Sequence, residues 1–160
     1  MSRDSSLGIP FDKFFSICGN YDSVIYGRAL SGWIRCFGGQ HDLAVEHLER
    51  AVRLSPVDPQ RPGMLAAIAV AHFAAGRFEI ASSLAKTAML EKSNNFMAAL
   101  AAAGANAMAG NLDIATSAMA RVRELDPTFC FSKVKDRVPH REPELLARWN
   151  DALRRAGLPE

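Results

Sequence analysis

The chain has 160 residues, a formal net charge of +2 and a pI near 8.6. This length allows one domain or a short row of stacked units, and the charge is too small to indicate nucleic acid as a partner. Hydrophobic residues make up 49% of the sequence and charged residues 22%, which excludes a disordered chain. Because alanine is abundant and the aromatic fraction is only 8%, we expect an all-α fold of closely packed helices.

Residues 1–20 are expected to form an amino-terminal arm or a partial helix, either folded onto the rest of the chain or left over from an earlier unit. The apolar residues of this segment are Phe11, Phe14, Phe15 and Ile17. No apolar run follows Arg3 and Asp4, so we expect no signal peptide. The most apolar stretches, residues 64–75 and 96–110, are too short to span a membrane. We therefore expect a cytoplasmic protein without a membrane partner.

Three segments of the chain, within residues 21–129, share one pattern of small residues. In each, an apolar helix ends at a glycine, an acid follows three residues later, and an alanine follows two residues after the acid. The three sets are Gly39, Asp42 and Ala44; Gly76, Glu79 and Ala81; and Gly110, Asp113 and Ala115. Glycine ends a helix without a Cβ clash, the acid faces the positive end of the next helix, and alanine allows two helices to approach closely. The pattern predicts three consecutive pairs of antiparallel helices.

The predicted units span about residues 22–56, 62–92 and 95–127. Their helices are expected at residues 22–37 and 42–54, 62–75 and 78–91, and 95–109 and 112–125. Gly32, Ala69 and Ala103 lie halfway along the first helices, at positions where neighbouring helices must touch.

Residues 130–160 are expected to cap the stack with a polar outer face. A short helix is predicted at residues 131–137, followed by a longer one that starts at Glu142-Pro143 and ends at Gly157. The apolar stripe of the longer helix consists of Leu145, Leu146, Trp149 and Leu153, at helical spacing.

The glycine turns, the small-residue columns and the closing prolines Pro56 and Pro127 resemble the tetratricopeptide repeat over about residues 23–129. Most of that repeat's aromatic signature is missing, and only Gly32 of its usual leucine-glycine pair is present. The resemblance implies a right-handed superhelix whose first helices line a concave groove for a peptide or a helix. Carried over to this sequence, the groove consists of Tyr26, Trp33, Phe37, Val70, Phe73, Met97, Leu100 and Met108. Lysine, arginine and asparagine do not occur at these positions, so we expect no clamp for a peptide's terminal carboxylate.

The predicted groove is apolar, and soluble proteins rarely leave so large an apolar face exposed. Either these residues are buried between the units or another element covers them. The covers considered are the amino-terminal arm at residues 9–17, a second copy of the chain and an amphipathic helix of another protein. The arm and the second copy are favoured because the phenylalanines of the arm also need burial. The expected partner is thus a protein or peptide, including a second copy in a homodimer.

No catalytic or cofactor motif is present: the sequence lacks a phosphate-binding loop with lysine, a nucleophile elbow and a His-Glu-x-x-His pair. Glu46-His47 has no second histidine at the right spacing, because His41 precedes the predicted helix. His72 is interpreted as a hydrogen-bonded core or groove histidine. Three cysteines without metal-ligand or redox spacing are interpreted as buried thiols: Cys18, Cys36 and Cys130. We expect no enzyme activity, no cofactor and no metal.

Residues 48–56 and 152–160 are similar to the repeat-containing carboxy-terminal parts of bacterial nucleotide cyclases and winged-helix regulators. In those proteins a catalytic or DNA-binding domain precedes the repeats. Two functional hypotheses follow. The favoured one is a non-enzymatic protein-interaction module. The alternative is the regulatory repeat region of a bacterial signalling protein, such as an adenylate or guanylate cyclase or a transcriptional regulator.

Overall fold

The computed structural model describes residues 24–159, apart from the side chains of residues 24–26 and 28. The predicted amino-terminal arm at residues 1–20 lies outside the described residues. The described part is all-α, as predicted, and contains eight helices. They are α2 (Val24–Phe37), α3 (His41–Leu54), α4 (Arg61–Ala74), α5 (Phe78–Glu91), α6 (Phe96–Met108), α7 (Leu112–Leu125), α8 (Phe131–Arg137) and α9 (Pro143–Arg155). From the end of α2 onward, the predicted helix ends are within about two residues of the observed ones.

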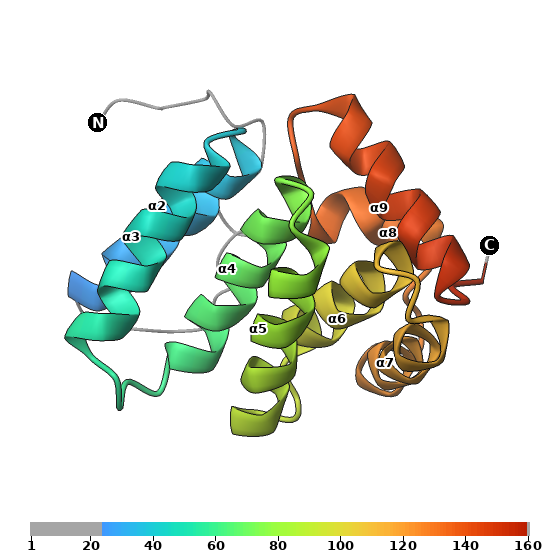
Figure 1. The fold of residues 1–160 in the computed structure, drawn as a ribbon, viewed down its shortest axis with the longest axis horizontal. Helices are drawn as coiled ribbons and strands as arrows, with labels where there is room; N and C mark the ends of the chain where they lie inside the picture. Colours follow the sequence, from blue (N-terminus) through green and yellow to red (C-terminus); the bar gives the residue numbers. More distant parts are fainter. Residues whose placement is uncertain (1–23, 160) are drawn as a thin grey trace.

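The helices pack as consecutive pairs in an antiparallel-like manner: α2 with α3, α4 with α5, and α6 with α7. Figure 1 shows the pairs following one another across the molecule, from α2 and α3 at one side to α6 and α7 at the other. The first helices of the pairs also contact one another, α2 with α4 and α4 with α6. The carboxy-terminal helices α8 and α9 pack together, and α9 lies against α6.

The turns inside the three pairs are alike. Gly39, Gly76 and Gly110 have φ angles of +87°, +78° and +86°, in the left-handed region that favours glycine. In each turn the residue after the glycine donates its backbone N–H to a carbonyl oxygen five residues earlier, at 2.8 Å. These glycine turns let each first helix end and the chain reverse within three residues.

The central helices α4 and α6 are buried along nearly their whole length. Every residue from Met64 to Ala74 is buried in α4, and every residue from Met97 to Ala107 in α6. The small residues predicted to lie at helix contacts are all buried: Gly32, Ala69, Ala103, Ala44, Ala81 and Ala115. A helix that is apolar on all sides needs neighbours on all sides. Despite this apolar character, none of the helices in the described part has the length and hydropathy required to span a bilayer.

The close approach of α2 and α3 predicts opposite effects for two glycine substitutions in α2. A Cβ atom at Gly32 would overlap the side chain of Leu48, which is fully buried and has little room to move. Overpacking of this kind costs about 1–3 kcal/mol, which outweighs the gain of up to ~1 kcal/mol in helix propensity. We expect Gly32→Ala to lower the free energy of unfolding in urea.

The matched control is Gly27→Ala in the same helix. A Cβ atom at Gly27 meets no described atom within 4 Å, so only the helix-propensity gain applies. This variant should be more stable than the wild type by roughly 0.5–1 kcal/mol. Equal effects at the two positions would contradict the observed packing of α2 on α3.

Candidate functional site

The structure buries most of the predicted groove. Six of the predicted groove residues are at most 6% exposed: Trp33, Phe37, Val70, Phe73, Met97 and Leu100. Met108 is partly buried, and the side chain of Tyr26 is not among those the structure describes. The structure therefore brings these residues into the core, and their role in binding a partner stays a prediction.

Helix α9 covers one of the predicted groove residues, Phe73, through Trp149. The indole of Trp149 stacks on the ring of Phe73 in α4, with centroids 3.9 Å apart and planes 29° apart. The indole also lies against Gly104 in α6, where a Cβ atom would be only 2.7 Å from Cζ3. Arg148, next to Trp149, donates a hydrogen bond from Nη1 to the carbonyl oxygen of Ala74 at 2.7 Å. The middle of α9 is thus attached both to the carboxyl end of α4 and to α6.

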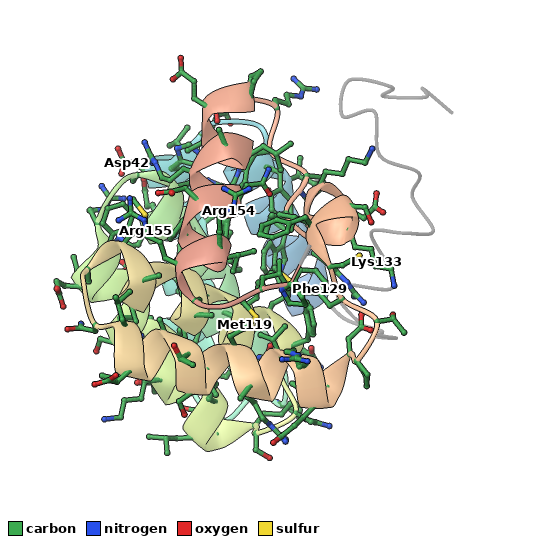
Figure 2. The ribbon with its side chains drawn as sticks, turned by 90° about the vertical axis from the view of Figure 1, so that its right-hand side faces the viewer. Asp42, Met119, Phe129, Lys133, Arg154 and Arg155 are labelled. Carbon is green, nitrogen blue, oxygen red and sulfur yellow. The ribbon has the colours of Figure 1, made fainter. Side chains whose placement is uncertain are left out.

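The amphipathic pattern predicted for α9 is confirmed. Leu145, Trp149 and Leu153 are buried on one side, and Leu146 is partly buried beside them. Figure 2 shows α9 above α7, with α8 beside it. The guanidinium group of Arg154 lies over the ring of Phe131 in α8, 5.0 Å from its centroid. The helix predicted to cap the chain thus also packs on α6.

This position of α9 corrects the sequence analysis. The covers considered there were the amino-terminal arm, a second copy of the chain and a helix of another protein. At Phe73 and Gly104 the carboxy-terminal helix of the same chain provides cover that the sequence did not predict, while the arm lies outside the described residues and the second copy stays a prediction. The physical reason is that α6 is apolar on all sides, and the strongest apolar stripe that follows it belongs to α9.

The segment between α8 and α9 lies against the turn between α2 and α3. The backbone N–H of Arg141 donates to the carbonyl oxygen of Phe37 at 3.1 Å. The His140 ring meets the Phe37 ring edge-on, with centroids 5.1 Å apart. The Oε1 atom of Glu142 lies where a Cβ atom of Gly39 would be, so the glycine turn makes room for this carboxylate. These contacts hold the beginning of α9 close to the beginning of α3.

Two histidines and a carboxylate meet at this point. His41 is the first residue of α3, and its Nε2 atom lies 3.9 Å from Oε2 of Glu142. The rings of His41 and His140 have centroids 6.1 Å apart. One potential ligand atom from each of the three residues lies within 4.8 Å of the other two. Among the described residues, this is the one group of histidine, cysteine and acidic side chains close enough to hold a metal ion.

The polar atoms of this group are buried. Within the described part of the chain, His41 Nε2 and Glu142 Oε2 have no hydrogen-bond partner, and the ring nitrogens of His140 have only a backbone interaction with Cys36. Burial lowers the pKa of His140 to about 3, and the neighbouring His41 acts in the same direction. Burial also lowers the pKa of His41, against the opposing effect of the Glu142 carboxylate. Both imidazoles are therefore neutral at pH 7, with lone pairs available to a ligand.

The other residues considered from the sequence have ordinary structural roles. His72 is buried and accepts a hydrogen bond at Nδ1 from Arg77 Nε at 2.8 Å, which confirms its interpretation as a hydrogen-bonded histidine. Cys36 is buried as predicted, and burial raises the pKa of its thiol. The interpretation is wrong for Cys130, which is partly exposed at the residue before α8, with Sγ 3.2 Å from Ser132 Oγ. Cys18 lies outside the described residues.

Comparison with known proteins identifies no family for this chain. No model of a protein family matches the sequence, and no curated protein matches it. The functional interpretation therefore depends on three features. They are the helix pairs, the surface of α4 and α6 on which α9 packs (the α9 seat), and the cluster of His41, His140 and Glu142.

The contact between Trp149 and Gly104 predicts a strong energetic coupling. Trp149→Ala should cost about 3–5 kcal/mol because it leaves a large cavity between α4, α6 and α9. Gly104→Ala alone should cost about 1–3 kcal/mol, since its methyl group would meet the indole. In the double variant the methyl group enters the space that the indole vacates, so the cost of Gly104→Ala should fall by at least ~1 kcal/mol.

The measurement is a double-mutant cycle from chemical unfolding curves of the four proteins. If the two substitutions are additive within about 0.5 kcal/mol, Trp149 does not lie on Gly104 in solution.

Proposed function

We propose that this chain is a non-enzymatic protein-interaction module built from three tetratricopeptide-like helical repeats. Three consecutive helix pairs with the same glycine turn and the same buried alanines support this proposal. A right-handed superhelical stack is part of it, with the first helices α2, α4 and α6 on the concave side. The proposed ligand is an amphipathic helix, provided either by another protein or by a second copy of this chain.

The observation that carries the proposal is that α9 is held on the helix pairs by a stripe of buried apolar side chains. Recognition of a helix in a groove uses anchor residues one and two turns apart on the ligand helix. In α9 the residues at this spacing are Leu145, Trp149 and Leu153, and all three are buried. Trp149 is the central anchor, because it reaches the backbone of α6 at Gly104 and stacks on Phe73. A partner helix with the same spacing and one aromatic anchor would fit the same seat.

In this proposal α9 competes with a partner helix for the same surface of α4 and α6. A segment tethered next to its site has an effective concentration in the millimolar range, so a free helix must overcome it before binding. The apparent affinity for a partner is reduced by the fraction of molecules in which the seat is open. The predicted groove residue Phe73, on which Trp149 stacks, then becomes part of the partner surface when α9 leaves.

The test uses a labelled peptide with the sequence of residues 141–158 and the full-length chain. Trp149→Ala weakens the hold of the chain's own helix, so the seat is open more often. We expect the peptide to bind this variant at least about 10-fold more tightly than the wild type, measured by fluorescence anisotropy.

Two controls distinguish specific binding of the peptide from non-specific hydrophobic association. A peptide carrying Trp149→Ala should bind neither protein. The second control is a chain carrying Arg155→Ala. The side chain of Arg155 is half-exposed in a surface ion pair with Asp151, so this variant should bind the peptide like the wild type. If circular dichroism shows that the Trp149→Ala chain is folded and the peptide still does not bind, this face does not accept a helix in trans and the proposal fails.

A further inference from the structure

The cluster at the start of α9 lies apart from the Trp149 contact on which the helix-binding proposal rests. We infer that His41, His140 and Glu142 form a binding site for a divalent transition-metal ion of the Zn²⁺ type. The site joins the first residue of α3 to the segment that leads into α9. Its basis is the convergence of three metal-binding side chains, from the start of α3 and from the segment before α9, with their polar atoms buried.

The first argument is that polar atoms of the cluster are buried without a hydrogen-bond partner. Buried polar atoms in folded proteins nearly always have a partner, because an unpaired one costs about 1–3 kcal/mol. In this cluster His41 Nε2 and Glu142 Oε2 have no hydrogen-bond partner among the described residues. His140 has only a backbone interaction with Cys36, which leaves one of its ring nitrogens without a partner. A cation bound between them would satisfy one nitrogen of each imidazole and one carboxylate oxygen at the same time.

The second argument is the type of ligand. Two imidazoles and one carboxylate are a common ligand set for Zn²⁺, with a fourth position left to water. Hard cations such as Mg²⁺ and Ca²⁺ prefer ligand sets made only of oxygen atoms. The set therefore favours Zn²⁺ and its neighbours Co²⁺ and Ni²⁺.

The third argument is geometry. Zinc–ligand bonds of about 2.0–2.2 Å place the ligand atoms of a tetrahedral site about 3.3 Å apart. The separations here are 3.9 Å between His41 Nε2 and Glu142 Oε2, and at most 4.8 Å within the group. Closing this difference requires side-chain movements of the order of 1 Å. His140 lies outside the helices, and Glu142 directly precedes α9, so both can adjust without breaking a helix.

The surrounding charges are compatible with a bound cation. Glu142 and Asp42 are the acidic groups that act on His41, and Arg77 and Arg148 are the basic ones. Both arginines already have partners: Arg77 pairs with Asp42 at 2.8 Å, and Arg148 donates to the carbonyl oxygen of Ala74. A bound ion would tie α3 to the start of α9 and so favour the closed position of α9.

The experiment is a titration of the full-length, untagged, metal-free chain with Co²⁺, followed by displacement with Zn²⁺. We expect one equivalent of Co²⁺ to bind with the visible absorption of a tetrahedral site, and Zn²⁺ to abolish this absorption. At a free Zn²⁺ concentration of 100 times its Kd, the thermal midpoint of unfolding should rise by roughly 5–10 °C.

The variants His140→Ala and Glu142→Gln decide whether the cluster is the site. Each should weaken Co²⁺ binding by at least about 100-fold, because loss of a direct ligand costs more than loss of its supporting contacts. The variant His47→Ala removes a histidine of α3 that is not part of the cluster, and should bind like the wild type. Glu142→Gln keeps the size of the side chain, so it decides the question if His140→Ala does not fold.

Two results would overturn the inference. One is the absence of saturable one-equivalent Co²⁺ binding to the wild-type chain. The other is binding that is unchanged in Glu142→Gln, which would place the ion elsewhere. Neither result depends on the peptide experiment, so the metal site and the helix-binding function stand or fall separately.

Discussion

Every side of α6 must be covered by protein, and this requirement determines how the rest of the chain is arranged. Residues from Met97 to Ala107 are all buried, and α4, α5, α7 and α9 each pack on this helix. Most of these residues are alanines, which let the neighbouring helices approach closely. Gly104 allows a still closer approach than alanine would, because without a side chain there the indole of Trp149 can lie on the α6 backbone. Helix α9 is therefore part of the core and not only a cap at the end of the chain.

This arrangement sets a condition for the proposed binding function. Each large apolar side chain moved from the core into water costs about 1.5–3 kcal/mol, and α9 buries Leu145, Trp149 and Leu153. A partner that displaces α9 must therefore bury a comparable apolar stripe in its place. The cluster of His41, His140 and Glu142 lies at the start of the same helix. A metal ion there would add to the cost of displacement, so the two proposed functions would act on one element.

The sequence predicts the helices well because their signals are local. Left-handed glycines end the first helices, and the stripe from Leu145 to Leu153 repeats at helical spacing. The seat of α9 could not be predicted, because periodicity identifies an apolar stripe but not the surface that it covers. The His41 cluster was missed for a related reason: metal motifs are recognised by short spacing, and this cluster joins residues from opposite ends of the described chain. Its signal was limited to histidines and an acid beside turns, which many sequences share.

The most direct test of the role of α9 is an NMR measurement of the environment of Trp149 in the isotope-labelled full-length chain. The structure predicts strong nuclear Overhauser effects from the indole ring protons of Trp149 to the α-protons of Gly104 and to the ring of Phe73. The α-protons of Gly104 should also be shifted by the ring current of the indole. Indole resonances at the positions of an unfolded chain, without cross-peaks to Gly104 or Phe73, would show that α9 does not cover the core in solution.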